Sequence, residues 1–308
     1  MISLSPKWVA EDLFEKRPPG LVRVASIYDH VINIYVESSN QLLMLAGTQM
    51  FKGPSSAGLG DKEFRILQNE LAIGDPAVFD GESIEFPGAA KIQLLNARRV
   101  SFGVPQRIEF DRQAFISNSA TVAQLLKKQA APHLCSVLLE ATNSSPALNV
   151  QHPAHFKESD CFWLFGKSIK AVFSKLVDAL IDDNRKAIEE YVEKIAGLGF
   201  GSSPTGDDLI HGALLAMHYN RYLEGSSWNA PDFKFDFRTR TTSLGAHMIA
   251  IAMRGLTPEP VLAFIKNVLE AKPVFSELKA LSAMGSDSGI SIATGFFLAT
   301  AKYWQKTV

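Results

Sequence analysis

The stretch GLGFGSSPTGDD, residues 197–208, combines residue types that can bind a small polar ligand. Its glycines let the backbone approach a ligand closely, and a helix is expected from Pro204 to about Tyr222. The start of a helix offers free backbone N–H groups with a partial positive charge. Ser203 before the proline is a good helix start, because a serine hydroxyl can cap these groups and proline there loses no hydrogen bond. The loop and helix start therefore predict an anion site.

Asp207 and Asp208 add a second chemistry to this helix start. Two carboxylates in a first turn already satisfy the helix dipole and repel a bare phosphate, so plain dipole stabilisation is one explanation for them. They could instead bind Mg²⁺ beside a phosphate, or accept hydrogen bonds from an amide or amino group of a substrate. We take both as candidate catalytic residues, with no metal ligand assigned and Mg²⁺ as the one cofactor that the pair would suit.

A second segment of the chain repeats the pattern. TGDDLIHGALLA from Thr205 aligns without gaps with SGISIATGFFLA from Ser288, and both fit Ser/Thr-Gly-x-Asp/Ser-x-x-x-Gly-x-x-Leu-Ala. Gly206 and Gly212 lie inside the expected helix, where each glycine costs about 1 kcal/mol relative to alanine. Either two helices pack closely through these small residues, or two polar helix starts converge on one ligand.

A third polar segment, RTRTTSLGAHMIAIAMRG, opens another apolar helix. Its arginines can bind a carboxylate or phosphate through two hydrogen bonds, or can simply be solvated. His211 and His247 lack any metal-ligand spacing, so a packed or surface position is expected for them. The candidate ligand-binding residues of the three segments are Gly199, Gly201, Ser203, Thr205, Gly206, Arg240, Thr242, Ser243, Gly285, Ser288 and Gly289.

Two regions of different texture must position these residues. From Leu21 to about Pro105, short β-branched and aromatic runs alternate with turn clusters, which predicts a small β-sandwich or barrel. After Asp111, apolar residues three and four positions apart predict helices, and Gly197 follows one of them as a left-handed cap. The expected class is α+β, with a β-rich domain at residues 1–110 and a mainly helical domain at residues 111–308. The dinucleotide motif is a poor match because the glycines follow a helix, and the P-loop motif is a poor match because its lysine is missing.

Composition limits the partners. The 308 residues include 31 Lys plus Arg and 32 Asp plus Glu, so no charge excess favours nucleic acid or an acidic membrane. The sequence contains no run of about 20 apolar residues, so no transmembrane helix is expected. Cys135 and Cys161 have no disulfide or metal-site spacing, which favours a reducing compartment and predicts a cytoplasmic protein.

The sequence also resembles a known family. GLGFGSSPTGDDLIHG resembles the GLGxGLTPSGDDxLxG motif of the AllH-type subunit of oxamate carbamoyltransferase, long catalogued as a domain of unknown function and sometimes labelled a carboxylase. Further family patterns resemble Asn33 in SIYDHVINIYV, Gly53-Pro54-Ser55, Thr241-Thr242-Ser243, and Gly285 with Ser288-Gly289. The sequence departs from the motif at Ser202-Ser203, where the family has Leu-Thr, and at Thr205, where it has Ser.

The resemblance implies a β-rich N-terminal domain, a helical C-terminal domain, and carbamoyl transfer between phosphate and oxamate-type acceptors in purine-nitrogen catabolism, alongside partner protein subunits. Amine attack on carbamoyl phosphate depends on positioning and on donors aimed at developing negative charge. Backbone N–H groups near residues 203–206 and 286–289 would supply them, an aspartate of the pair would hold the NH₂ group or take its proton, and Arg240 would meet a carboxylate. The leading hypothesis is such a subunit, binding a small anionic ligand; the alternative is a noncatalytic ligand-binding or assembly subunit.

Overall fold

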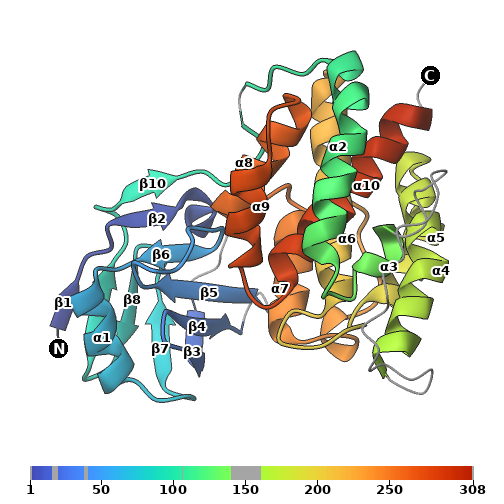
Figure 1. The fold of residues 1–308 in the computed structure, drawn as a ribbon. Coiled ribbons are helices and arrows are strands. Elements are labelled where there is room, and N and C mark those ends of the chain that lie inside the picture. The colour runs from blue at the N-terminus through green and yellow to red at the C-terminus, as the bar shows by residue number, and fades with distance from the viewer. Residues whose placement is uncertain (1, 16–19, 38–40, 106, 140–160, 307–308) are drawn as a thin grey trace. The chain divides into compact units, whose positions relative to one another are not determined.

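A computed structural model describes most of the chain, and its described residues fall into two compact units (Figure 1). One unit comprises Met1–Gly103 with Thr257–Glu259, and the other comprises Val104–Leu256 with Pro260–Val308. Strands dominate the first and helices the second, which confirms the predicted α+β class. The described residues are 2–15, 20–37, 41–105, 107–139 and 161–306.

The strands of the first unit form one curled sheet, so the sandwich form of the prediction, with two stacked sheets, is not the one adopted. Their order is β1-β9-β8-β7-β3-β4-β5-β6-β2-β10, with parallel pairing at β1–β9, β5–β6 and β2–β10. The bounds are β1 Ile2–Leu4, β2 Trp8–Ala10, β3 Gly20–Ile27, β4 Val31–Val36, β5 Gln41–Ala46, β6 Ser56–Gly58, β7 Pro76–Phe79, β8 Ser83–Phe86, β9 Ala90–Gln93 and β10 Arg98–Val100.

Alternation of side chains explains the central hairpin of this sheet. Val22 and Val24 of β3 are buried opposite Val36 and Ile34 of β4, while the intervening Arg23 is exposed. The predicted turns are confirmed, since the glycines at 74, 81 and 88 all have positive φ, the left-handed conformation that favours glycine. The helix α1, Asp61–Glu70, was not predicted.

Helices make up most of the second unit. The first turn of α5 is capped by Asn184, whose side chain accepts from the N–H of Ala187, and Gly197 with φ +78° confirms the predicted left-handed end. The bounds are α2 Arg112–Ala130, α3 Ser136–Leu139, α4 Cys161–Ile181, α5 Arg185–Ile195, α6 Thr205–Leu223, η3 Phe237–Thr239, α7 Ser243–Ala252, α8 Glu259–Leu269, α9 Phe275–Ser282 and α10 Ser288–Lys306. The first unit also contains the short 3₁₀ helix η1, Glu11–Phe14.

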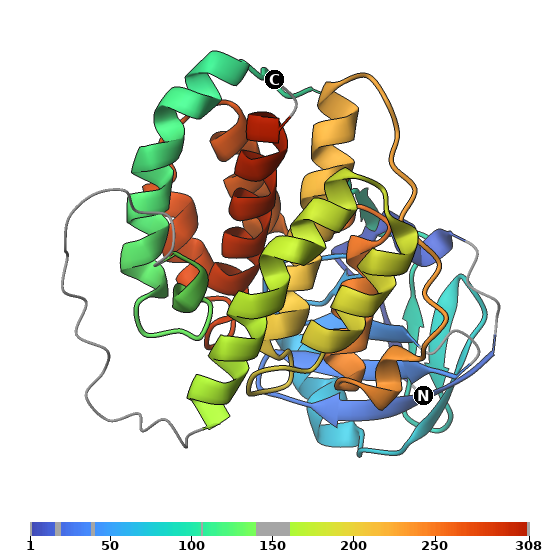
Figure 2. The same cartoon turned by 90° about the vertical axis from the view of Figure 1, so that its right-hand side faces the viewer.

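The two repeated segments form α6 and α10, which lie side by side and contact each other at their small residues (Figures 1 and 2). A Cβ atom on Gly212 would lie 2.2 Å from the carbonyl oxygen of Ile292, and one on Gly295 would lie 2.4 Å from that of Leu209. Close packing of the two backbones therefore requires glycine at both positions. The packing explanation of these glycines is confirmed.

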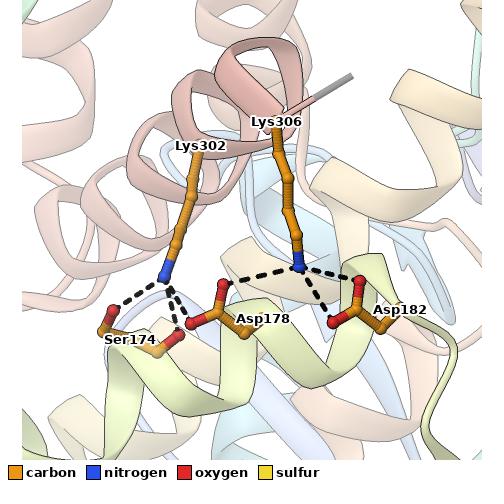
Figure 3. A network of polar contacts seen from close by, with 5 residues as sticks. All are labelled: Ser174, Asp178, Asp182, Lys302 and Lys306. Atoms are coloured by element: carbon orange, nitrogen blue, oxygen red, sulfur yellow. Dashed lines mark hydrogen bonds and ion pairs between the residues drawn. The ribbon is translucent and has the colours of Figure 1, made fainter. Parts of the chain in front are cut away.

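The C-terminal half of α10 is tied to α4 by two lysines (Figure 3). Lys302 Nζ lies 2.7 Å from Asp178 Oδ2 and 2.8 Å from Ser174 Oγ, and Lys306 Nζ lies 2.7 Å from Asp182 Oδ1. All these side chains are partly exposed, so each pair contributes little to stability by itself. Among the residues described, no helix has both the length and the apolarity to cross a membrane.

Candidate functional site

The starts of α6 and α10 are built in the same way. A Cβ atom on Gly206 would lie 2.1 Å from the carbonyl oxygen of Ile195 at the end of α5, and one on Gly289 would lie 2.2 Å from that of Leu281 in α9. Each helix start is therefore pressed against the helix that precedes it. The repeat seen in the sequence is a repeated helix-loop-helix arrangement, and backbone packing accounts for the missing side chains at both glycines.

The N–H groups of these two glycines are engaged within the chain. Gly206 donates to the carbonyl oxygen of Leu198 at 2.7 Å, and Gly289 donates to that of Met284 at 3.2 Å. By contrast, Thr205 and its counterpart in α10 are first helical residues, whose N–H groups precede the intrahelical ladder. Within the first turns of the two helices, Thr205 and Ser288 therefore remain as candidate backbone donors.

Side chains join the two helix starts. Thr205 Oγ1 donates to Asp287 Oδ2 at 2.8 Å, which links the first residue of α6 to the residue before α10. In the opposite direction, the Ser288 hydroxyl at the start of α10 lies close enough to the carboxyl group of Asp208 to lower its pKa. Two hydroxyl–carboxyl contacts therefore hold the repeated segments together.

Asp207 is fully buried and holds two segments in place. Its Oδ1 accepts from the N–H of Gly197 at 2.8 Å, and its Oδ2 accepts from the hydroxyl of Thr241. Burial raises the pKa of Asp207 to about 6, and the two hydrogen bonds oppose the rise. The carboxyl group thus connects the end of α5 with the segment before α7.

Asp208 is also fully buried. Burial raises its pKa well above the ordinary value; the Ser203 and Ser288 hydroxyls oppose this rise, and Asp287 and Asp207 increase it. Ser203 Oγ donates to Asp208 Oδ1 at 2.6 Å, whereas no described residue makes a hydrogen bond of standard geometry to Oδ2. Burial thus favours the neutral form of this carboxyl group.

The predicted capping role of Ser203 is wrong. The N-cap position of α6 is Pro204, with no side-chain cap, and the helix begins one residue later than expected. The Ser203 hydroxyl donates to the buried carboxyl group of Asp208 instead, which gives this polar group a hydrogen-bond partner away from water.

The third polar segment meets the same site. Thr242 caps α7 by accepting from the N–H of Gly245 at 2.9 Å, and its hydroxyl donates to the carbonyl oxygen of Ser202. Ser243 is the exposed first residue of α7. A Cβ atom on Gly245 would lie 2.1 Å from Asp207 Oδ2, so α7 approaches α6 closely here.

Arg240 is paired within the chain. Its guanidinium forms an ion pair with Glu193 of α5, and both side chains are about half-exposed. A Cβ atom on Gly197 would lie 2.0 Å from the carbonyl oxygen of Arg240, so the backbone before α7 packs on the loop after α5. The arginine thus lies beside the site but binds a glutamate in this conformation.

The loop glycines adopt conformations that other residues rarely do. Gly199, Gly201 and Gly285 have φ values of +128°, +87° and +70°. A Cβ atom on Gly199 would also lie 2.6 Å from the backbone nitrogen of Thr205, whereas nothing lies within 4 Å of one on Gly201. Glycine at these positions is explained by backbone conformation.

Two contributors to the site were missed by sequence reasoning. Asp287 accepts from Thr205, and its place directly before the repeated segment was the available signal. Gly245 is the other, and a glycine inside an apolar helix was its signal. His211 and His247 are buried, which confirms a packed position, and burial lowers the pKa of His211 to about 3. Within the described ranges, no group of three or more His, Cys, Asp or Glu is placed to hold a metal ion.

The structure thus defines an α+β protein whose helical unit brings three polar segments together at paired helix starts. Comparison with protein families then places it. The family described as "Oxamate carbamoyltransferase subunit AllH" matches residues 195–300, and the "AllH family N-terminal domain" matches residues 3–99. The chain belongs to the AllH family, as the motif resemblance predicted. No curated protein and no solved structure matches the chain.

Proposed function

We propose that this chain is a subunit of an enzyme that transfers a carbamoyl group between phosphate and an oxamate-type acceptor. Its ligand site would be the polar junction, defined as residues 199–205, 241–243 and 285–288. One observation carries this placement: the contact of Thr205 with Asp287 joins two repeated helix starts inside the family-matched range. Close packing of two helices does not by itself require three hydroxyl-rich segments to meet at one place.

The electrostatics of the junction support a small anionic ligand. Each helix start contributes a partial positive charge and free N–H groups. Burial favours the neutral form of Asp208, which removes one of the negative charges that would repel an anion. The hydroxyl groups of Ser202 and Ser243 lie on exposed residues and can donate, whereas those of Thr242 and Ser286 donate to the Ser202 carbonyl oxygen and to Asp287 in this conformation.

The transfer itself requires little covalent chemistry from the protein. The acceptor nitrogen bonds to the carbamoyl carbon of carbamoyl phosphate, the carbon–oxygen bond to phosphate breaks, and the nitrogen loses a proton. The phosphate leaves with the electron pair of the broken bond. Such a reaction gains most from holding both reactants in line and from donors near the departing phosphate. The hydroxyls and N–H groups of the polar junction are suited to that task.

Burial leads us to assign different roles to the carboxyl groups. Asp207 and Asp208 are fully buried with internal donors, so we assign them a positioning role: they fix the loop after α5 and the two helix starts. Asp287 is only partly buried, and we assign it the hydrogen bond to the acceptor amide and the acceptance of its proton. Arg240 would meet a ligand carboxylate after leaving Glu193.

A noncatalytic ligand-binding or assembly subunit is the second candidate. The ion pair between Arg240 and Glu193 favours it, because the one arginine assigned to the junction is already paired. In that case the reacting groups would lie on a partner subunit. The two candidates share the ligand site and differ in where the chemistry happens.

The test is an assay of phosphate release from carbamoyl phosphate with oxamate present, on the chain alone and on the complex co-expressed with the products of neighbouring genes. Ser288→Ala should lower the rate of the complex at least tenfold, through lost positioning of Asp208 and a lost donor. Ser276→Ala is the matched control, because it removes an exposed hydroxyl of α9 outside the junction. An active complex that tolerates Ser288→Ala removes the junction from the site. No transfer in any combination argues against the carbamoyltransferase assignment.

A further inference from the structure

Asn33 in β4 has a buried side-chain amide whose oxygen has no hydrogen-bond donor among the described residues. Its side chain is only 6% exposed, and its Nδ2 donates to Ser26 Oγ of β3 at 2.9 Å. The other end, Oδ1, accepts no hydrogen bond from any described residue. Turning the amide over would exchange the two ends and leave the NH₂ group without a partner instead. A buried polar atom left unpaired costs about 1–3 kcal/mol, so this amide requires an explanation.

Asn33 lies in a row of polar and small side chains across neighbouring strands. Ser26 pairs with Asn33, Asn33 with Met44 of β5, and Met44 with Ser56 of β6, so the four side chains share one face of the sheet. A register shift in β3 between Val24 and Ser26 brings Ser26 opposite Asn33. Such bulges re-aim side chains and are frequent beside binding sites.

Access to the amide is provided by its neighbours. Ser26 and Met44 flank Asn33 in the row, and both are partly exposed, whereas Ser56 is buried. Solvent therefore reaches the row on both sides of the asparagine, while the amide itself is shielded. Since Oδ1 of Asn33 is itself buried, a small ligand would reach it when the side chain of Met44 moves aside.

The far end of the row is held rigidly. Ser55, which precedes β6, has φ +56°, an uncommon conformation for a residue with a side chain. The buried carboxylate of Asp12 fixes it by accepting from both its N–H and its hydroxyl, each at 2.8 Å. The Ser56 hydroxyl donates to the carbonyl oxygen of Gly53. The carboxylate thus sets the start of β6 beside Met44, and with it the shape of the row.

We propose that Ser26, Asn33 and Met44 form a subsite for the primary amide group of a small ligand. The free end of the asparagine pairs with the amide, and the hydroxyl of Ser26 fixes its orientation. Met44 supplies an adaptable apolar contact beside it. No charged side chain belongs to the row, so the group bound here is neutral, which suits a carboxamide or carbamoyl group and disfavours a carboxylate. Only this choice of ligand rests on the proposed function.

The test compares oxamate with oxalate, which replaces the amide by a second carboxylate, and with acetamide, which has the amide alone. Nitrogen-15 NMR spectra of the full chain report directly on the side-chain NH₂ group of Asn33. Oxamate and acetamide should shift this signal, and oxalate should leave it unchanged. If neither amide moves it, the unpaired atom is satisfied by buried water alone and the proposal fails.

Titration calorimetry on variants gives an independent readout. Asn33→Leu should weaken oxamate binding roughly tenfold while preserving the melting temperature, because an apolar replacement removes the unpaired polar atom. Tyr35→Phe is the matched control, two residues along β4 on the same face, and should bind like the wild type. Unchanged binding by Asn33→Leu overturns the proposal; if that variant does not fold, the wild-type NMR result decides.

The two proposals fail separately. Oxamate binding through Asn33 in a complex that transfers no carbamoyl group would leave the amide subsite standing and remove the proposed function. Carbamoyl transfer by a protein in which neither oxamate nor acetamide moves the Asn33 signal would do the reverse.

Discussion

The Asp207→Asn variant tests whether the charge of this carboxyl group stabilises the fold. Asp207 is fully buried between the end of α5 and the start of α7, with donors from Gly197 and Thr241. Asparagine preserves the shape and both contacts, since its oxygen can accept from the N–H of Gly197 and its NH₂ group can donate to the hydroxyl of Thr241. The change therefore removes mainly a buried charge.

The size of the effect follows from the pKa. Burial raises the pKa of Asp207 from 3.8 to about 6. Because the folded state binds the proton more tightly than the unfolded state, this stabilising contribution is complete below about pH 4 and is lost as pH rises through 6. A rise of about two pKa units corresponds to about 3 kcal/mol of lost stability above that range. The variant lacks this loss, and removing the charge also relieves the neighbouring Asp208.

Urea unfolding between pH 4.5 and 8, followed by circular dichroism, measures the difference. The variant should gain about 1–3 kcal/mol in unfolding free energy relative to the wild type as pH rises, after allowance for weaker hydrogen bonds to a neutral amide. Asp236→Asn is the control: hydrogen bonds with Arg238 lower the pKa of this exposed carboxyl group below 3.8, so its contribution is already complete at pH 4.5 and the variant should differ from the wild type by a nearly constant amount across this range. A pH-independent difference for Asp207→Asn, or a loss above about 2 kcal/mol at pH 7.5, would refute the reasoning.

Three further variants test the packing and the site. Gly212→Ala should cost about 1–3 kcal/mol in urea unfolding, since its Cβ atom would lie 2.2 Å from the carbonyl oxygen of Ile292; neutral behaviour would contradict the close α6–α10 contact. Ser203→Ala should cost about 1–3 kcal/mol, because it removes the donor to the buried carboxyl group of Asp208, and an unchanged denaturation midpoint would speak against that hydrogen bond. Lys306→Gln should change the free energy of unfolding by less than about 1 kcal/mol, because its partners are partly exposed. A larger loss of stability in thermal unfolding would show a cooperative lysine network.

Local patterns predicted much of the fold. The β-branched runs of β3 and β4, the turn glycines and the 3.6-residue periodicity of α5 are local signals, and the structure confirms each of them. The joining of all strands into one sheet depends on long-range pairing such as β2 with β10, which no local pattern encodes. The short helix α1 was missed because the surrounding strand and turn signals dominated that region.

The site was predicted as segments rather than as contacts. The repeat between residues 205 and 288 anticipated that the two helix starts belong together, because equivalent small residues must meet for the helices to cross closely. The partners of individual side chains could not be foreseen: Ser203 donates to Asp208 rather than capping its helix, and Thr205 finds Asp287 across 82 positions of sequence. Each hydrogen-bond partner depends on which polar groups the tertiary structure brings within reach of one another.

We propose that the paired starts of α6 and α10 bind the small anion of a carbamoyl transfer. A crystal structure of the protein soaked in phosphate tests this most directly, and a soak of Ser288→Ala crystals serves as the control. We expect phosphate density within hydrogen-bond distance of Thr205, Ser288 or their backbone nitrogens, and its loss in the variant. Phosphate bound only elsewhere, or a junction that stays empty at saturating phosphate, would contradict it.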